Sequence, residues 1–165
     1  MRKMIYATGN EGKFREAKLI LSEWELEQRA VDIPEIQGDR EEVTRAKALA
    51  TVAILGEPCI VEDVSLFCPA LNGFPGPYAK CFVRTVGLEK IYKILETVGD
   101  CRVTAICTAA YVEPGCEPIL FEGELHGQIV PPKGTLKVGK YSFNAVFMPD
   151  GYERTLGVGW HNNKK

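Results

Sequence analysis

The sequence lacks a long apolar run, an excess of positive charge and any motif of paired cysteines. A membrane-spanning helix needs about 20 consecutive apolar residues, and no window approaches that length. Lys and Arg together number 20 against 22 for Asp and Glu, so the chain carries no global positive field of the kind that attracts nucleic acid. We therefore expect neither a membrane partner nor a nucleic-acid partner.

Signals for export and for zinc binding are also absent. The opening stretch MRKMIYATGN becomes polar too soon for a secretory signal, which favours a cytoplasmic protein. The six cysteines form no C-x-x-C pair and no cysteine–histidine spacing that is typical of a zinc site. Several lie in apolar runs, such as Cys59 in PCIV and Cys107 in AICTA. We interpret them as reduced, buried thiols.

The pattern of apolar residues predicts the class of fold. With 165 residues, 45% of them hydrophobic, the chain is long enough for one domain with a sizeable core, and we expect a single domain over residues 1–165. Strand–helix–strand units followed by a hairpin predict an α/β fold with a mixed sheet and flanking helices. The periodicity places a strand at 3–8, a helix at 11–22, a strand within 24–33, a helix at 41–55, a short strand at 59–61, a helix at 87–97 and a hairpin of 102–112 with 118–130.

The stretch TGNEGK, residues 8–13, lies where the first predicted strand leads into the first predicted helix. The first N–H groups of a helix lack partners within the helix and its dipole end is positive, so an anion fits there. Thr8 and Asn10 can cap or donate, and Lys13 adds a mobile cation. The stretch matches neither G-x-x-x-x-G-K-[ST] nor G-x-G-x-x-G, and an ordinary helix cap with a solvated lysine explains it equally well.

Two further places put charge next to apolar sequence. Lys47 falls inside the apolar stripe of the helix at 41–55, and a lysine there either extends to water or meets an anion, because burying an unpartnered ammonium costs several kcal/mol. Glu62 and Asp63 directly follow the short strand at 59–61, where open α/β sheets bind ligands. These acids could hold a hard cation or activate a water, or they could form a strand-end cap or a surface pair. The apolar stripe of the helix at 41–55, in which Lys47 falls, comprises Val43, Ala46, Ala50, Ala53 and Ile54.

Six blocks in order point to a known family: TGNEGK, DIPEIQGD, EVTRAKALA, VEDVSLF, ALNGFPGPYAK and MPDGY. Over roughly residues 4 to 152 the chain resembles the inosine triphosphate pyrophosphatase family, whose members hydrolyse non-standard purine nucleoside triphosphates. The resemblance implies cleavage between the α and β phosphates to a nucleoside monophosphate and pyrophosphate. It also implies a long mixed β-sheet forming two lobes around a central cleft, and a homodimer.

The resemblance further implies roles for individual residues, with Mg²⁺ as cofactor. Asp63, Lys13 and Lys47 are the implied catalytic residues, with Asp63 as metal ligand and base. Glu35, Glu62 and Asp63 are the implied metal ligands. The implied triphosphate contacts are Thr8, Gly9, Asn10, Glu11, Gly12, Lys13, Lys47 and Lys80.

The chain departs from the family pattern where the base is read. YSFNAVF corresponds best to the family segment FGWDPIF, so Phe143 is implied to stack on the base, while Asn144 replaces the aspartate that reads it. An amide offers a donor as well as an acceptor, which makes a changed base preference an expectation. The sequence ends in GVGWHNNKK without the family's Ser-His-Arg trio and closing helix, and we interpret His161 and Lys164 as a frayed tail.

Two functions stay open at this point. The first is Mg²⁺-dependent hydrolysis of non-standard purine nucleoside triphosphates such as ITP, dITP and XTP. The second is a family descendant that has lost turnover and binds nucleotide or a protein partner. His126 favours neither, because it alternates with acidic and amide residues on the polar face of its strand, and we interpret it as solvated.

Overall fold

The computed structural model describes residues 2–133 and 142–158, so His161, Lys164 and the segment 134–141 lie outside the described residues. The chain divides into two compact units. The first comprises Met1–Asp63 and Cys107–Glu122, and the second comprises Val64–Ile106 and Gly123–Lys165. The single domain expected over residues 1–165 stays a prediction.

The strands form one hydrogen-bonded sheet in the order β2-β1-β3-β5-β6-β7, with β4 paired to β3. β1 is parallel to β2 and β3, whereas the β3–β4 and β6–β7 pairs are antiparallel. The predicted α/β fold with a mixed sheet is therefore confirmed. The strands are β1 (Arg2–Ala7), β2 (Trp24–Arg29), β3 (Cys59–Phe67), β4 (Pro75–Gly76), β5 (Arg102–Val112), β6 (Ile119–Ile129) and β7 (Phe147–Pro149).

Four α-helices lie within the described residues, and three of them match predicted helices to within two residues at either end. The unpredicted helix, α3, has only eight residues and follows a stretch rich in glycine and proline, which hid its short periodic pattern. In the part of the chain that the structure describes, no helix combines the length and apolar character needed to cross a bilayer. The helices are α1 (Glu11–Ile20), α2 (Arg40–Leu55), α3 (Ala79–Val86) and α4 (Leu88–Val98).

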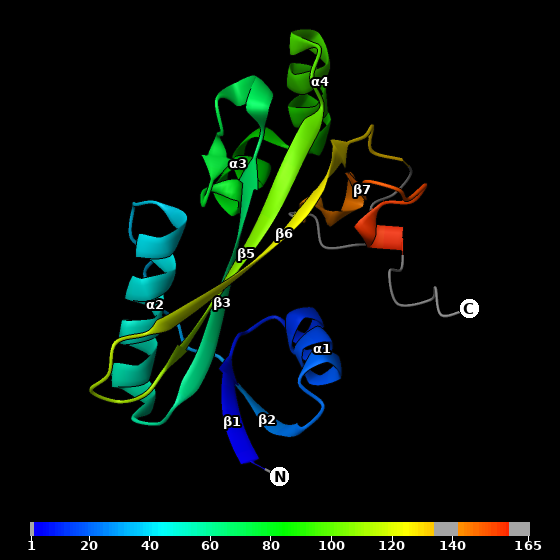
Figure 1. Ribbon diagram of the computed structural model, residues 1–165. Coiled ribbons are helices and arrows are strands. Elements are labelled where there is room, and N and C mark those ends of the chain that lie inside the picture. Colours follow the sequence, from blue (N-terminus) through cyan, green and yellow to red (C-terminus); the bar gives the residue numbers. More distant parts are fainter. Residues whose placement is uncertain (1, 134–141, 159–165) are drawn as a thin grey trace. The chain divides into compact units, whose positions relative to one another are not determined.

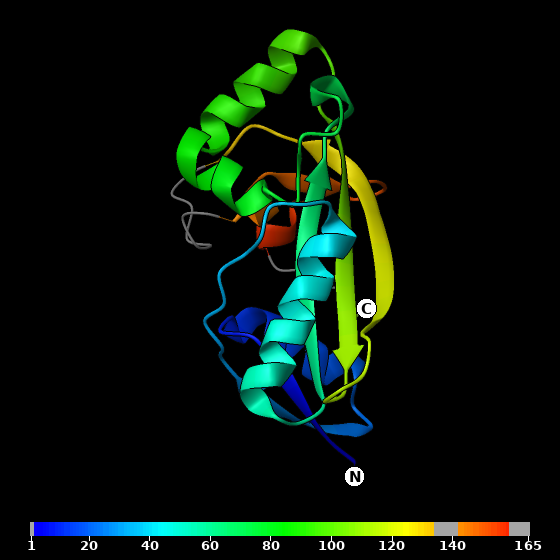
Figure 2. The same cartoon turned by 90° about the vertical axis from the view of Figure 1, so that its left-hand side faces the viewer.

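In the first unit, α1 and α2 cover opposite faces of the sheet (Figure 1). Figure 2 shows α2 lying along β3. The two faces of β1 alternate, as strand side chains do: Met4 and Tyr6 pack with Ala17 of α1, whereas Ile5 and Ala7 pack with residues of α2. The end of β1 is thus held between two helices.

The buried face of α2 differs from the predicted apolar stripe. Val43 is buried as expected, but Ala53 is exposed and Ile54 is 63% exposed. The helix instead buries two threonines together with Ala48 and Val52. The prediction failed because it counted only apolar residues, whereas Thr44 satisfies its hydroxyl within the helix by donating to the Arg40 carbonyl at 2.8 Å.

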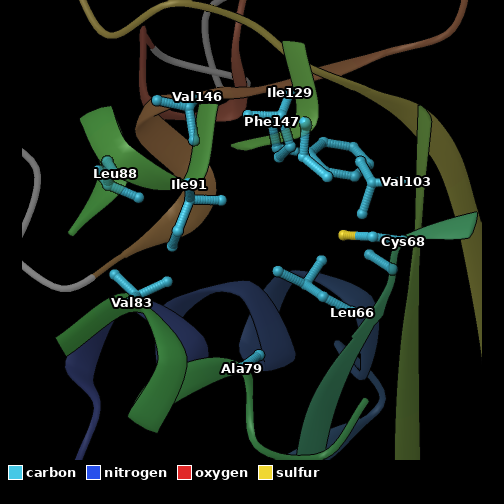
Figure 3. Close-up of a cluster of buried hydrophobic side chains, with 12 residues drawn as sticks. Leu66, Cys68, Ala79, Val83, Leu88, Ile91, Val103, Ile129, Val146 and Phe147 are labelled. Carbon is cyan, nitrogen blue, oxygen red and sulfur yellow. The ribbon is translucent and has the colours of Figure 1, made fainter. Parts of the chain in front are cut away.

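The second unit has a core of its own, which Figure 3 shows in close-up. Side chains of α3 and α4, including Val83, Leu88 and Ile91, meet Leu66 of β3 and Phe147 of β7 there. The amphipathic pattern of residues 87–97 therefore predicted the right face of α4. This core belongs to the second unit, and β3, which contributes Leu66 to it, begins in the first unit.

β5 and β6 form the predicted hairpin. Ile129 N donates to Cys101 O at 2.8 Å, and Thr104 Oγ1 lies 3.0 Å from His126 Nδ1. From the first contact to the second, the residue number rises by three on one strand and falls by three on the other, which is the register of an antiparallel pair. The His126 side chain is 62% exposed, so its interpretation as solvated is confirmed.

Candidate functional site

The carboxyl end of β1 is a topological switch point. The chain passes from β1 through α1 to β2 on one side, then through α2 to β3 on the other side of β1. Open α/β sheets bind ligands in the crevice outside strand ends at such a point. β1 stops at Ala7, while β3 continues to Phe67, so the acids of β3 lie just beyond the end of β1.

The loop after β1 is organised by its own side chains. Asn10 caps α1: its Oδ1 accepts hydrogen bonds from Gly12 N at 2.9 Å and Lys13 N at 3.1 Å. Thr8 Oγ1 accepts from Asn10 N at 3.1 Å, and Gln28 Nε2 of β2 donates to Thr8 O at 3.1 Å. The helix cap considered from the sequence is confirmed, and it holds Lys13 in a fixed first turn.

Glycine at position 12 keeps this cap compact. A Cβ on Gly12 would come to 3.1 Å from Asn10 Oδ1, which is tighter than ordinary contact. A side chain there would push against the oxygen that caps the helix. The close approach of Asn10 thus explains one glycine of the TGNEGK stretch.

Glu62 is the centre of a cluster of polar side chains just beyond the end of β1. Lys13 Nζ lies 3.1 Å from Glu62 Oε1, and Cys107 Sγ of β5 donates to Glu62 Oε2 at 3.4 Å. The hydroxyl of Tyr6 on β1 also hydrogen-bonds to this carboxylate. The Glu62 side chain is only 17% exposed, so these contacts take the place of most of its water.

The surroundings of Glu62 favour its charged form. Burial alone would raise the pKa of Glu62, but the charge of Lys13 and the hydrogen bonds from Tyr6, Lys13 and Cys107 outweigh burial and lower it below 4.5. Burial, and then the nearby Glu62, raises the pKa of Tyr6 and raises the pKa of Cys107 to about 12. Both donors therefore keep their protons at neutral pH.

Lys47 reaches the same residue from the other face of the sheet. Its Nζ donates to the backbone carbonyl of Glu62 at 2.9 Å. Lys47 is half-buried. It therefore does not extend freely to water, which was one of the two alternatives that the sequence left open. The structure thus brings both predicted phosphate-binding lysines of the first unit to Glu62, one at its side chain and one at its main chain.

Asp63 and Glu62 lie within β3 and not after it. The short strand expected at 59–61 extends to Phe67, because polar residues continue the strand where the apolar run stops. Strand alternation directs Asp63 to the face that Val61 shares with α2, and Glu62 to the α1 face. The two acids therefore lie beyond the carboxyl end of β1, although they are in the middle of their own strand.

The predicted metal ligands are carboxylates, which suit Mg²⁺. Glu35 is an exposed residue of the segment between β2 and α2. Among residues 2–133 and 142–158, no three His, Cys, Asp or Glu side chains gather closely enough to form a metal site by themselves. Mg²⁺ is commonly held by one or two carboxylates together with substrate phosphates and waters, so the donor chemistry of Glu62 and Asp63 fits it. The metal roles stay predictions.

The second unit carries the remaining predicted residues. Lys80 is exposed near the start of α3. Phe143 is half-buried and packs edge-on against Phe147, with ring centroids 6.1 Å apart. Asn144 N donates to Ser142 Oγ at 3.3 Å. The roles of these residues toward a base or phosphate stay predictions.

Three residues of the site were not predicted from the sequence. Tyr6 appeared to be one more apolar strand residue, and Cys107 appeared to be a buried thiol. Gln28 lies in a strand that the sequence located only loosely. A hydroxyl inside an otherwise apolar strand was the one available signal, because a buried Tyr usually finds a hydrogen-bond partner.

Known proteins resemble this chain over most of its length. A sequence model described as the Ham1 family matches residues 4–164. The inosine triphosphate pyrophosphatase of Puccinia graminis f. sp. tritici is 43% identical over 146 residues, which cover 83% of this chain and 76% of that protein. The dITP/XTP pyrophosphatase of Methanopyrus kandleri is 42% identical over 163 residues, covering 94% of this chain and 85% of that protein.

Solved structures share the fold. A HAM1 protein from Coxiella burnetii superposes with a TM-score of 0.77 at 23% identity, over 95% of this chain and 86% of that one. The Ham1 protein of Staphylococcus aureus gives a TM-score of 0.70 at 25% identity, over 94% of this chain and 85% of that one. The arrangement of strands and helices described above is therefore shared with these proteins.

Proposed function

Because the chain belongs to the Ham1 family, we propose that it hydrolyses nucleoside triphosphates to the monophosphate and pyrophosphate, with non-standard purine nucleotides such as ITP, dITP and XTP as substrates. The relatives named above are pyrophosphatases of this kind. The observation that carries the proposal is the meeting of Lys13 and Lys47 at Glu62, beside the capped amino end of α1.

Positive groups at this point suit a polyanionic substrate. A triphosphate carries close to four negative charges, and a water must approach an already anionic phosphorus atom. Lys13, Lys47 and the positive end of the α1 dipole lower the activation free energy of this attack, because they stabilise negative charge where it accumulates. Thr8 and Asn10 hold the backbone of the loop in shape, so the start of α1 needs little rearrangement when the substrate arrives.

Mg²⁺ is the cofactor that the carboxylates of the site suit. Glu35, Glu62 and Asp63 would hold it, and when bound it neutralises phosphate charge and polarises phosphate oxygens. The remaining chemistry falls to the chain's own residues. Asp63 accepts a proton from the attacking water, Lys13 and Lys47 bind phosphate oxygens, and the bond between the α and β phosphates breaks as the water oxygen bonds to phosphorus.

The test is an assay of pyrophosphate release. The protein is incubated with Mg²⁺ and with ITP, XTP, dITP or ATP, and both products are quantified. We expect release from the non-standard purine substrates, and a loss of about 10²-fold or more in kcat for Asp63→Asn. Asp32→Asn, an exposed aspartate between β2 and α2, is the matched control and should keep its rate.

Two outcomes contradict this proposal. Binding of ITP without pyrophosphate release from any substrate would favour the nucleotide-binding descendant, and a full rate for Asp63→Asn would remove that residue from its role. The homodimer and the cytoplasmic location stay predictions. Analytical ultracentrifugation and cell fractionation test them.

A further inference from the structure

The Glu62 carboxylate has two uncharged donors in addition to its ion pair. Lys13 takes Oε1, Cys107 donates its thiol to Oε2, and the Tyr6 hydroxyl donates to the same carboxylate. Neither Tyr6 nor Cys107 is assigned a role by the hydrolysis proposed above. Both nonetheless hydrogen-bond to the carboxylate of the residue at which Lys13 and Lys47 meet.

Lys13 cannot serve Glu62 and a phosphate group equally. Its ammonium lies 3.1 Å from Glu62 Oε1. A triphosphate bound as proposed above would offer Lys13 a second and more highly charged anionic partner. When Lys13 turns to phosphate, the Glu62 carboxylate loses the hydrogen bond from that ammonium while its side chain is only 17% exposed, and it has to keep its position to help hold Mg²⁺. A carboxylate in that position needs other donors to keep its place.

The two uncharged donors are better anchored than the lysine. Tyr6 lies on β1 and Cys107 on β5, the two strands that flank β3 in the sheet. Tyr6 is 5% exposed, and its ring packs near Phe14 of α1 with centroids 6.4 Å apart. Lys13 holds its charge on a long, flexible side chain, whereas the two donors reach Glu62 from rigid strands on both sides.

We propose that Tyr6 and Cys107 are positioning residues, which hold the Glu62 carboxylate in place when Lys13 exchanges it for a phosphate of the substrate. This inference rests on the proposed hydrolysis for its effect on turnover. Its structural part does not, because the bond between Cys107 and Glu62 can be observed without substrate. Outer hydrogen-bond partners of this kind typically change activity by about 10- to 100-fold when they are removed.

The kinetic test compares Tyr6→Phe, Cys107→Ala and the double variant with ITP and Mg²⁺. We expect kcat to fall about tenfold in each single variant while KM changes less than about threefold, because the lysines that bind phosphate remain. The double variant should lose less than the product of the two single losses, since both donors act on one carboxylate. Cys107→Ser, which restores a donor, should recover part of the rate.

Two variants serve as matched controls. Tyr111→Phe removes a tyrosine hydroxyl that hydrogen-bonds to Glu113 at 2.6 Å, and Cys59→Ala removes a fully buried thiol. Both should leave kcat and KM unchanged. A raised KM with an unchanged kcat in Tyr6→Phe and Cys107→Ala, or equal losses of kcat in the controls, overturns the proposal.

A spectroscopic test separates this proposal from the hydrolysis itself. The S–H stretching band of Cys107, identified by its disappearance in Cys107→Ala, reports by infrared whether the thiol donates a hydrogen bond. Lys13→Met imitates the departure of the lysine, and we expect the band to stay at its hydrogen-bonded position there. A shift to the position of a free thiol overturns the proposal, whether or not the protein releases pyrophosphate.

Discussion

At the scale of single residues, the ion pair of Lys13 with Glu62 can be compared with a more exposed pair of the same residue types. Lys13 and Glu62 are 31% and 17% exposed, whereas Lys3 and Glu25 form a pair at 3.9 Å with side chains 78% and 55% exposed. Removing Lys13 leaves a carboxylate that water reaches poorly, while removing Lys3 leaves one that water reaches freely.

We therefore expect Lys13→Met to lower the free energy of unfolding by about 1–3 kcal/mol. Lys3→Met should change it by less than about 0.5 kcal/mol. Urea denaturation of both variants beside the wild type measures the difference. Equal effects of the two substitutions would show that the Lys13–Glu62 pair behaves as an ordinary surface pair.

Cysteine chemistry offers a second test at this scale. The expected burial of the cysteines is wrong for Cys81 and Cys116, which are exposed. Burial raises the pKa of each of the remaining four thiols, to about 11 for Cys59 and Cys68. Since the thiolate is the reactive form, we expect a disulfide reagent at about pH 8 to modify two thiols of the native protein promptly and the other four only after denaturation. The variant carrying Cys81→Ser and Cys116→Ser should show no prompt reaction. Prompt reaction of a third thiol would contradict the burial described here.

Asp100 gives a test of pH dependence. Hydrogen bonds from the Arg102 guanidinium and main chain lower the pKa of Asp100 from 3.8 to about 2. A depressed folded-state pKa contributes stability above the unfolded value, and this contribution is lost as pH falls through the folded value. Asp100→Asn should therefore lower Tm at about pH 6, and the difference from wild type should shrink between about pH 4 and pH 2. A difference that stays constant down to pH 2 would exclude the charge as its cause.

Residues of the site were predictable where the sequence itself carries the chemistry. The helix cap of Asn10 and the cations Lys13 and Lys47 follow from residue type and spacing. Tyr6 and Cys107 were missed because their significance comes from a partner far along the chain: the Glu62 carboxylate is 45 residues from Cys107. Local sequence patterns do not show that β1 and β5 are the neighbours of β3 in the sheet.

At the scale of elements, the start of α2 is fixed by a capping box. Asp39 Oδ1 accepts from Glu42 N at 2.9 Å, and Glu42 Oε2 accepts from Asp39 N at 2.9 Å. We expect Asp39→Ala to cost about 1 kcal/mol of unfolding free energy, while Asp39→Ser, which keeps a cap, should cost only a few tenths. Thermal or urea denaturation measures both. Equal losses would mean that the side chain acts there through its charge and not as a cap.

Helices and strands differed in how well the sequence predicted them. The amphipathic pattern found α1, α2 and α4 with nearly correct ends, since caps and apolar spacing are local. The strand expected at 59–61 was too short, because Glu62 and Asp63 look like strand ends, whereas Glu62 lies within β3 and is held there by Lys13 of α1 and Cys107 of β5. The buried face of α2 was misjudged because burial there includes Thr44 and Thr51.

At the scale of the whole molecule, the two compact units share strands. β3, β5 and β6 each begin in one unit and end in the other. Each unit also has a core of its own: Val61 is buried in the first, and Leu95 is buried in the second. Units joined by continuous strands lose hydrogen-bonded ladders together, which favours a single cooperative transition.

We therefore expect differential scanning calorimetry to show one unfolding transition, with a calorimetric enthalpy equal to the van't Hoff enthalpy. Leu95→Ala should cost about 2–5 kcal/mol and Val61→Ala about 2 kcal/mol, the latter from two lost methyl groups and the cavity that they leave. Because unfolding is shared, each substitution should shift the whole transition to lower temperature, although each lies in only one unit. If Leu95→Ala splits the transition and leaves part of the heat absorption at the wild-type temperature, the units unfold separately and residues 1–165 do not behave as one domain.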